Sequence, residues 1–82
     1  MELLNKLGEA YCSQNKFKEA EELFLKIIKL NPEDPTVLNN LGVVFANLND
    51  NGKALSYFQK VLQLDPENED ALANLDQIKS IY

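Results

Sequence analysis

The 82-residue sequence contains no histidine, no arginine and no tryptophan, and it has a single cysteine, Cys12. Without histidine there is no Ser–His or Cys–His pair for nucleophilic catalysis and no imidazole ligand for a metal ion. One cysteine excludes a disulfide within the chain, which favours a reducing compartment, and we expect the cytoplasm. Most of the usual catalytic chemistry is therefore missing, and we expect no enzyme activity, no cofactor and no metal.

Long apolar runs are also missing. No stretch approaches the roughly 18 apolar residues that a membrane-spanning helix needs, and charges throughout residues 1–30 argue against a signal peptide. Eight lysines stand against thirteen acidic residues, which gives a formal net charge of −5. Because nucleic-acid binding needs clustered basic residues, we expect neither a nucleic-acid nor a membrane partner.

What the chain does have is an ordinary globular composition, with 45% hydrophobic and 26% charged residues. Its length leaves no room for a second core, so we expect one domain over residues 1–82. The three glycines are isolated from one another, which excludes a glycine-rich phosphate-binding loop.

Residues 1–34 resemble residues 35–68 in register. Eleven of the 34 aligned pairs are identical. A third copy begins at Glu69 and soon loses fidelity to the other two. The chain therefore divides into repeat one (1–34), repeat two (35–68) and a final segment (69–82).

Apolar residues recur at helical spacing within each copy. Asn15 and Asn49 suit the left-handed residue that closes a helix. Asp34 before Pro35 is typical of an N-cap followed by proline in the first turn. We predict five helices, at residues 2–14, 17–30, 35–48, 52–64 and 69–81, the fourth frayed at Gly52. Their short connections make successive helices antiparallel.

The spacing of these residues resembles the tetratricopeptide repeat. The matching positions are Leu7, Gly8, Tyr11, Ala20, Phe24 and Pro32 in repeat one, and Leu41, Gly42, Phe45, Ala54, Phe58 and Pro66 in repeat two. The resemblance covers nearly the whole chain, but leucine stands at Leu4 and Leu38, where the family often has tryptophan. It implies an all-α fold of antiparallel helix-turn-helix repeats, stacked as a short right-handed α-solenoid of five helices.

We expect the matching glycine, alanine, leucine and aromatic residues to form the core. Gly8 and Gly42 would let the two helices of each repeat approach closely, and the small residues they face would be Ala20 and Ala54. Overpacking at either glycine, as in a valine substitution, should then cost about 1–3 kcal/mol of stability.

The final segment departs from the repeat in a way that is typical of a terminal cap. Asp76 and Lys79 replace the glycine and the aromatic residue, so its outward face is polar. Leu72, Leu75 and Ile78 would pack back against repeat two. We therefore expect a capping helix at residues 69–82 and a true end of the array there.

The N-terminal end has no such cap. Leu3 and Ala10 would lie where an earlier repeat packs in a longer array. Three explanations stay open: the chain is a fragment of a longer array, the face pairs with another molecule, or two apolar side chains are simply exposed.

In this family the first helices of successive repeats line a concave face, so the resemblance implies a groove. Its predicted lining is Asn5, Glu9, Cys12, Asn39, Asn40, Val43, Asn47, Asn74 and Gln77. Small and amide side chains can hydrogen-bond the backbone of an extended peptide. Asn40 and Asn74 resemble the asparagine ladder of some family members, although asparagine is also common as a solvated surface residue. Cys12 is better interpreted as a small filler than as a reactive thiol.

The best-known subclass of the family grips the C-terminal carboxylate of a heat-shock chaperone with lysines, an arginine and asparagines. Only Asn40 fits that pattern, because Asn5, Glu9, Asp70 and Asn74 stand at its other positions. Two of these residues place negative charge where an anion would dock. We therefore expect a neutral or basic partner segment and not a chaperone carboxylate.

Two functions follow as hypotheses. The first is a non-catalytic scaffold module that binds a protein or peptide in the concave groove. The alternative is a structural module that self-associates into a homo-oligomer through the uncapped face at Leu3 and Ala10.

Overall fold

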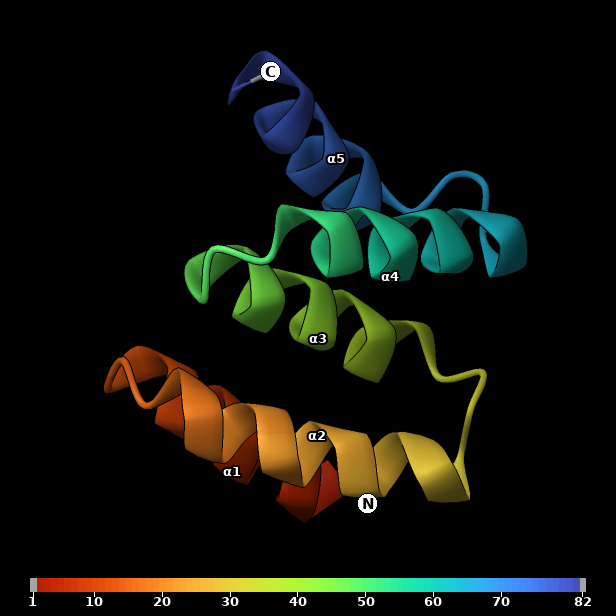
Figure 1. Ribbon diagram of the computed structural model, residues 1–82. Coiled ribbons are helices and arrows are strands. Elements are labelled where there is room, and N and C mark those ends of the chain that lie inside the picture. Colours follow the sequence, from red (N-terminus) through yellow and green to blue (C-terminus); the bar gives the residue numbers. More distant parts are fainter. Residues whose placement is uncertain (1, 82) are drawn as a thin grey trace.

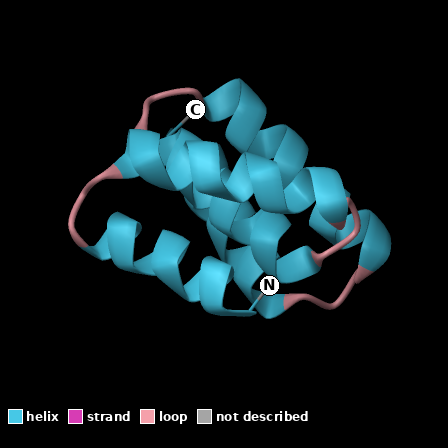
Figure 2. Cartoon of the chain, turned by 90° about the horizontal axis from the view of Figure 1, so that it is seen from below, coloured by secondary structure: helices cyan, strands magenta, loops and turns pink. Residues whose placement is uncertain are grey.

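The computed structural model describes the backbone of residues 2–81 and the side chains of residues 3–78. It contains α1 (Glu2–Ser13), α2 (Phe17–Leu30), α3 (Pro35–Asn47), α4 (Asn51–Leu64) and α5 (Glu69–Ile81). Each helix lies within one residue of its predicted bounds, and the described residues form no strand. Short loops join the helices (Figure 2).

The helices stack in chain order from one end of the molecule to the other (Figure 1). α1 packs on α2, α2 on α3, α3 on α4 and α4 on α5. The central helix, α3, also contacts α1 and α5. The predicted all-α fold of stacked helical hairpins is confirmed, with α1–α2 and α3–α4 as the hairpins and α5 beside the second.

The turns inside both hairpins close in the same way. Asn15 and Asn49 have left-handed φ values of 61° and 66°, as predicted. The N–H of the residue after each asparagine donates a 2.8 Å hydrogen bond to the carbonyl five positions earlier, on Tyr11 or Phe45. Asparagine tolerates this backbone conformation better than most residues do, so the sequence sets where α1 and α3 end.

Aspartate side chains cap the start of α3 and α4. The Asp34 carboxylate accepts two backbone N–H groups of the first turn of α3, at 3.0 and 3.4 Å, which confirms the predicted cap. Asp50 accepts the Lys53 N–H at 3.2 Å. Because this second cap satisfies a donor at the helix start, α4 begins at Asn51 and Gly52 lies inside it. α4 therefore starts one residue earlier than the predicted start at 52.

Within the first hairpin, the nearest side chain to Gly8 is the ring of Phe24, whereas the sequence predicts Ala20. A Cβ added to Gly8 would lie 2.5 Å from Phe24 Cε1, much closer than van der Waals contact allows. The Phe24 ring is fully buried. Ala20 is buried as well, but the large ring is what takes up the space that the glycine leaves.

The second hairpin repeats this contact. The nearest side chain to Gly42 is Phe58, whereas the sequence predicts Ala54, and a Cβ on Gly42 would lie 2.6 Å from Phe58 Cζ. Helical spacing identifies which residues are small, but it does not show which neighbour fills the space beside them.

In the first helix of each repeat, two positions seven residues apart are buried whenever another hairpin precedes that helix. We call these two positions the outer register. On α3 and α5 the residues at this register are at most 3% exposed: Val37, Val44, Ala71 and Ile78. On α1 the same register holds Leu3, which is 82% exposed, and Ala10, which is also exposed. α5 has no second helix after it in the described chain, yet its residues at this register are buried. The preceding hairpin is therefore what buries them.

Two leucines predicted in the core are largely exposed. Leu7 is 44% exposed, because no hairpin precedes α1 in the described chain. Leu72 is 48% exposed, because no described helix follows α5, whereas its counterpart Leu38 is buried against Val61 on α4. The inward contact assigned to Leu72 is made by Ala71 instead. Asp76 is exposed, as predicted. The side chain of Lys79 lies outside the described residues.

We predict that Gly42→Ala destabilises the fold by about 1–3 kcal/mol, because its Cβ overlaps the Phe58 ring in a filled core. Gly52→Ala is the matched control. A Cβ there meets its nearest neighbour, Asp50 Oδ1, only at 3.8 Å, and alanine favours a helix over glycine by about 0.5–1 kcal/mol. Urea unfolding of both variants measures the difference. Equal midpoints would contradict the packing described.

Candidate binding surface

The side chains predicted to line the groove come from α1, α3 and α5, and α3 contacts both of the other helices. Three of these side chains are exposed: Glu9, Asn47 and Gln77. Five are partly exposed: Asn5, Cys12, Asn40, Val43 and Asn74. The remaining one, Asn39, is buried.

Two of the asparagines meet across the hairpins. Asn40 Nδ2 on α3 donates a 3.1 Å hydrogen bond to Asn5 Oδ1 on α1. The bond ties the two helices together and fixes the orientation of both amides. Each amide has more bonding capacity than this one bond uses, since an amide offers two donors and an acceptor. Asn40 Oδ1 can therefore still accept a hydrogen bond from a ligand backbone, and Asn5 Nδ2 can still donate one.

Asn39 does not belong to the surface, which corrects the prediction. Its side chain is 8% exposed, and Asn39 Nδ2 donates to Asn68 Oδ1 at 3.0 Å. The same Asn68 oxygen accepts the Ala71 N–H at 2.9 Å at the start of α5. Asn39 therefore joins α3 to the loop that leads into α5, and among the described atoms its own Oδ1 has no partner. Asn5 stands at the same repeat position but remains on the surface.

Asn47 and Val43 share one end of the surface on α3. Asn47 Nδ2 donates to the Val43 carbonyl at 2.8 Å, one turn earlier in the same helix. This bond orients the Asn47 side chain along α3 beside the half-buried Val43 side chain. The surface thus combines oriented amides with one apolar contact point.

Cys12 is half-buried on α1, packed against the core. Burial raises the pKa of its thiol, and the negative charge of Glu9 raises the pKa further. A raised pKa lowers the thiolate population at neutral pH, and the thiolate is the nucleophile. The environment therefore supports the interpretation of Cys12 as a filler.

We predict that iodoacetamide alkylates Cys12 more slowly than it alkylates the same chain unfolded in urea. The physical reason is the raised thiol pKa together with partial burial. Mass spectrometry of samples quenched at pH 7.5 gives both rates. A folded-state rate equal to or above the unfolded rate would show an activated thiol.

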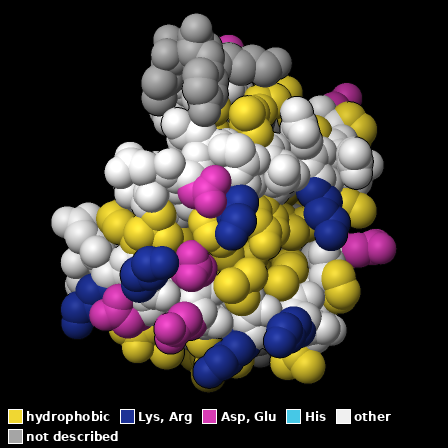
Figure 3. All heavy atoms as spheres, in the orientation of Figure 1, with side chains coloured by type: hydrophobic (Ala, Val, Ile, Leu, Met, Phe, Trp, Pro, Cys, Tyr) yellow, Lys and Arg dark blue, Asp and Glu magenta, His cyan; other side chains and the backbone are white. Residues whose placement is uncertain are grey.

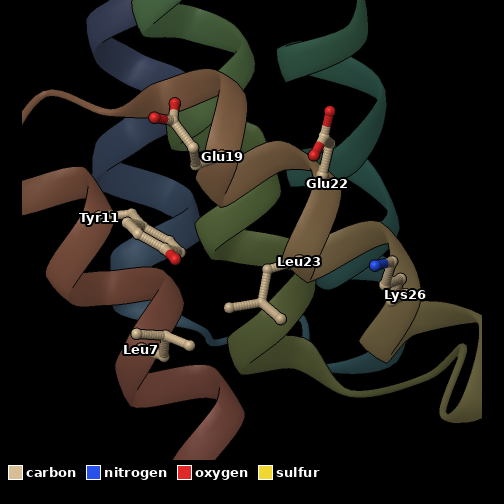
Figure 4. Close-up of a pocket in the computed structure, with 6 residues that line it drawn as sticks. All are labelled: Leu7, Tyr11, Glu19, Glu22, Leu23 and Lys26. Atoms are coloured by element: carbon tan, nitrogen blue, oxygen red, sulfur yellow. The ribbon is translucent and has the colours of Figure 1, made fainter.

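A hollow that the sequence did not predict lies between α1 and α2. It is lined by Leu7, Tyr11, Glu19, Glu22, Leu23 and Lys26. Figure 4 shows the Leu7 and Leu23 side chains pointing toward one another, with Tyr11 beside them. In Figure 3, acidic and basic side chains alternate around hydrophobic ones over the part of the molecule where Figure 1 shows α2.

Neither surface has the features of a metal centre. In the part of the chain with described side chains, no cluster of three or more His, Cys, Asp or Glu residues could hold a metal ion. Among the described helices, none has the length and apolar character to span a membrane.

No curated protein matches the chain. A family model described as "Tetratricopeptide repeat" matches residues 5–69, which is well over half of the sequence and covers both glycine–phenylalanine contacts. The match agrees with the two stacked helical hairpins and their shared turn geometry. The chain belongs to the tetratricopeptide repeat family.

Proposed function

We propose that this chain is a non-catalytic module that binds a protein or peptide segment across the surface of α1, α3 and α5. Tetratricopeptide repeats generally mediate protein–protein interaction and scaffolding. The observation that carries the proposal is the Asn5–Asn40 amide pair, which is held in place by its own hydrogen bond on the shared face of two helices. The half-buried Cys12 thiol is compatible with a reducing compartment, and we place the module in the cytoplasm.

The amide pair supports binding through the backbone of an extended segment. Amides that are already oriented lose little conformational freedom on binding, so more of each hydrogen bond's free energy remains for affinity. Each such bond contributes about 0.5–1.5 kcal/mol net. Val43 adds a small apolar contact on the same face. With so few anchors, we expect affinity in the micromolar range at best.

Charge favours a neutral or basic partner segment. Glu9 on α1 and Asp70 on α5 are exposed, and the whole chain carries −5. An acidic segment would be repelled, whereas a basic one would be drawn in faster at low salt.

We predict that Asn40→Ala and Val43→Glu weaken binding of peptides selected from a random 12-residue display library. Losing one amide contact should reduce affinity about 2- to 12-fold, and burying the new carboxylate at position 43 should reduce it further. Fluorescence anisotropy with the selected peptides measures the dissociation constants.

The matched control is Gln59→Glu, which adds the same negative charge to an exposed position on α4, away from this surface. Circular dichroism melts verify that each variant stays folded. If binding survives Asn40→Ala, Asn74→Ala and Val43→Glu unchanged, this surface does not bind the peptides and the proposal fails.

A further inference from the structure

The hollow between α1 and α2 has a counterpart one repeat later. Each residue that lines it corresponds to the residue 34 positions on: Leu41, Phe45, Lys53, Ser56, Tyr57 and Lys60. In the second hairpin Leu41 and Phe45, the counterparts of Leu7 and Tyr11, are buried. The chain therefore contains an occupied example of the site that is open in the first hairpin.

In the second hairpin, α2 packs on α3 at this place, and Lys53 Nζ of the hairpin itself lies 5.2 Å from the centroid of the Phe45 ring. Phe45 is 5% exposed and stacks on Tyr57 with ring centroids 5.5 Å apart. Leu25 and Ile28 of α2 pack in the same apolar cluster as these rings. Burial raises the pKa of the Tyr57 phenol, and the charge of Glu21 on α2 adds to the rise, so Glu21 lies near the ring.

The occupant in this example is an amphipathic helix. Glu21, Leu25 and Ile28 lie at i, i+4 and i+7, which is one face of α2. Its apolar residues belong to the same apolar cluster as Leu41 and Phe45, and its acidic residue lies on the same face of α2.

In the first hairpin the floor is open. Leu7 is 44% and Leu3 is 82% exposed, whereas Leu41 and Val37 at the same register are buried by the preceding hairpin. Adjacent exposed leucines on one face are a stronger signal of a docking site than scattered ones.

The rim changes sign between the two hairpins. Around the filled place stand Lys53, Ser56 and Lys60, which carry a formal charge of +2. Around the open hollow stand Glu19, Glu22 and Lys26, which carry −1. At the second hairpin, α2 packs on α3 and carries Glu21. By the same complementarity, the acidic rim suits a helix with a basic residue at that position.

We propose that the open face of α1 and α2 binds a basic amphipathic helix of a partner protein, packed as α2 packs on the second hairpin. This surface is separate from the amide surface of α1, α3 and α5, and the inference does not depend on the function proposed there.

Charge argues against a second copy as the occupant. Two chains of −5 repel each other. At the opposite end of the stack, α5 exposes Glu69, Asp70 and Asp76, so head-to-tail pairing would bring acidic residues against the acidic rim.

The test uses two synthetic peptides with the sequence of residues 17–30, one native and one with Glu21→Lys. A lactam between Glu22 and Lys26 holds both peptides helical and lies off the binding face. Calorimetry at 150 mM NaCl compares them on the whole 82-residue chain. We expect the Glu21→Lys peptide to bind about three- to tenfold more tightly than the native peptide, which is the scale of one or two exposed ion pairs.

Three variants of the chain make the test specific. Glu19→Lys with Glu22→Ser replaces the two acidic rim residues of the first hairpin with the residue types that stand at 53 and 56 in the second. This variant should reverse the peptide preference. Glu67→Lys with Asp76→Ser changes the net charge equally at the far end and should leave the preference intact. Leu7→Glu, at a half-exposed position that tolerates charge, should abolish binding of both peptides while helicity is retained.

No binding of either peptide, or the same preference in the rim variant as in the unchanged chain, would overturn the proposal. So would an equal effect of the far-end control, because the attraction would then be only long-range. Sedimentation equilibrium tests a second copy of the chain as the occupant. A mass that rises above 9.3 kDa with concentration and returns to it in Leu3→Glu would assign the face to a second copy, against the proposal.

Discussion

A helical hairpin of this size buries only part of its apolar surface by itself, and the rest must be covered by a neighbour. The inner part is closed by a phenylalanine ring seated against a glycine of the facing helix, in both hairpins. The outer part is closed by the hairpin that comes before. Val37 and Val44 on α3, and Ala71 and Ile78 on α5, are buried for this reason. Stability in such a stack is a sum of hairpin and interface terms.

The same constraint separates the two candidate surfaces. The face shared by α1, α3 and α5 is built from amides whose orientation is set by contacts between helices, as in the Asn5–Asn40 pair. It suits ligands that offer backbone hydrogen bonds. The outer face of α1 and α2 is apolar with an acidic rim, and it suits a side-chain contact with another helix. Each surface follows from the position of a hairpin in the stack.

Local features were predictable because they depend on neighbours in the sequence. The left-handed Asn15 and Asn49, the cap at Asp34 and the bounds of the five helices belong to this group. The repeat followed from the spacing of identical residues, and its family followed from a resemblance to a known repeat pattern. The prediction of which side chain lies nearest each glycine across the hairpin was wrong. The spacing placed alanine beside each glycine, but a longer side chain from the same helix reaches that space first.

Most residues of the candidate surface were predicted, but the hydrogen bonds between their side chains were not. Asn5 and Asn39 occupy the same repeat position, yet only Asn39 is buried, where its amide donates to the Asn68 oxygen that also accepts the Ala71 N–H at the start of α5. No pattern within α3 signals this. The hollow at Leu7 did have a signal in the sequence: aligning residues 19, 22 and 26 with 53, 56 and 60 shows the change of rim charge.

The central claim is that each hairpin buries its outer face against the one before, so that α1 is less supported than α3. Native-state hydrogen exchange tests it most directly, because amide protection reports local opening helix by helix. The account predicts that the amides of α3, which contacts all four other helices, exchange most slowly, and that those of α1 exchange faster than the equivalent amides of α3. Equal protection along α1 and α3 would contradict it, since the preceding hairpin would then add nothing to the stability of the next.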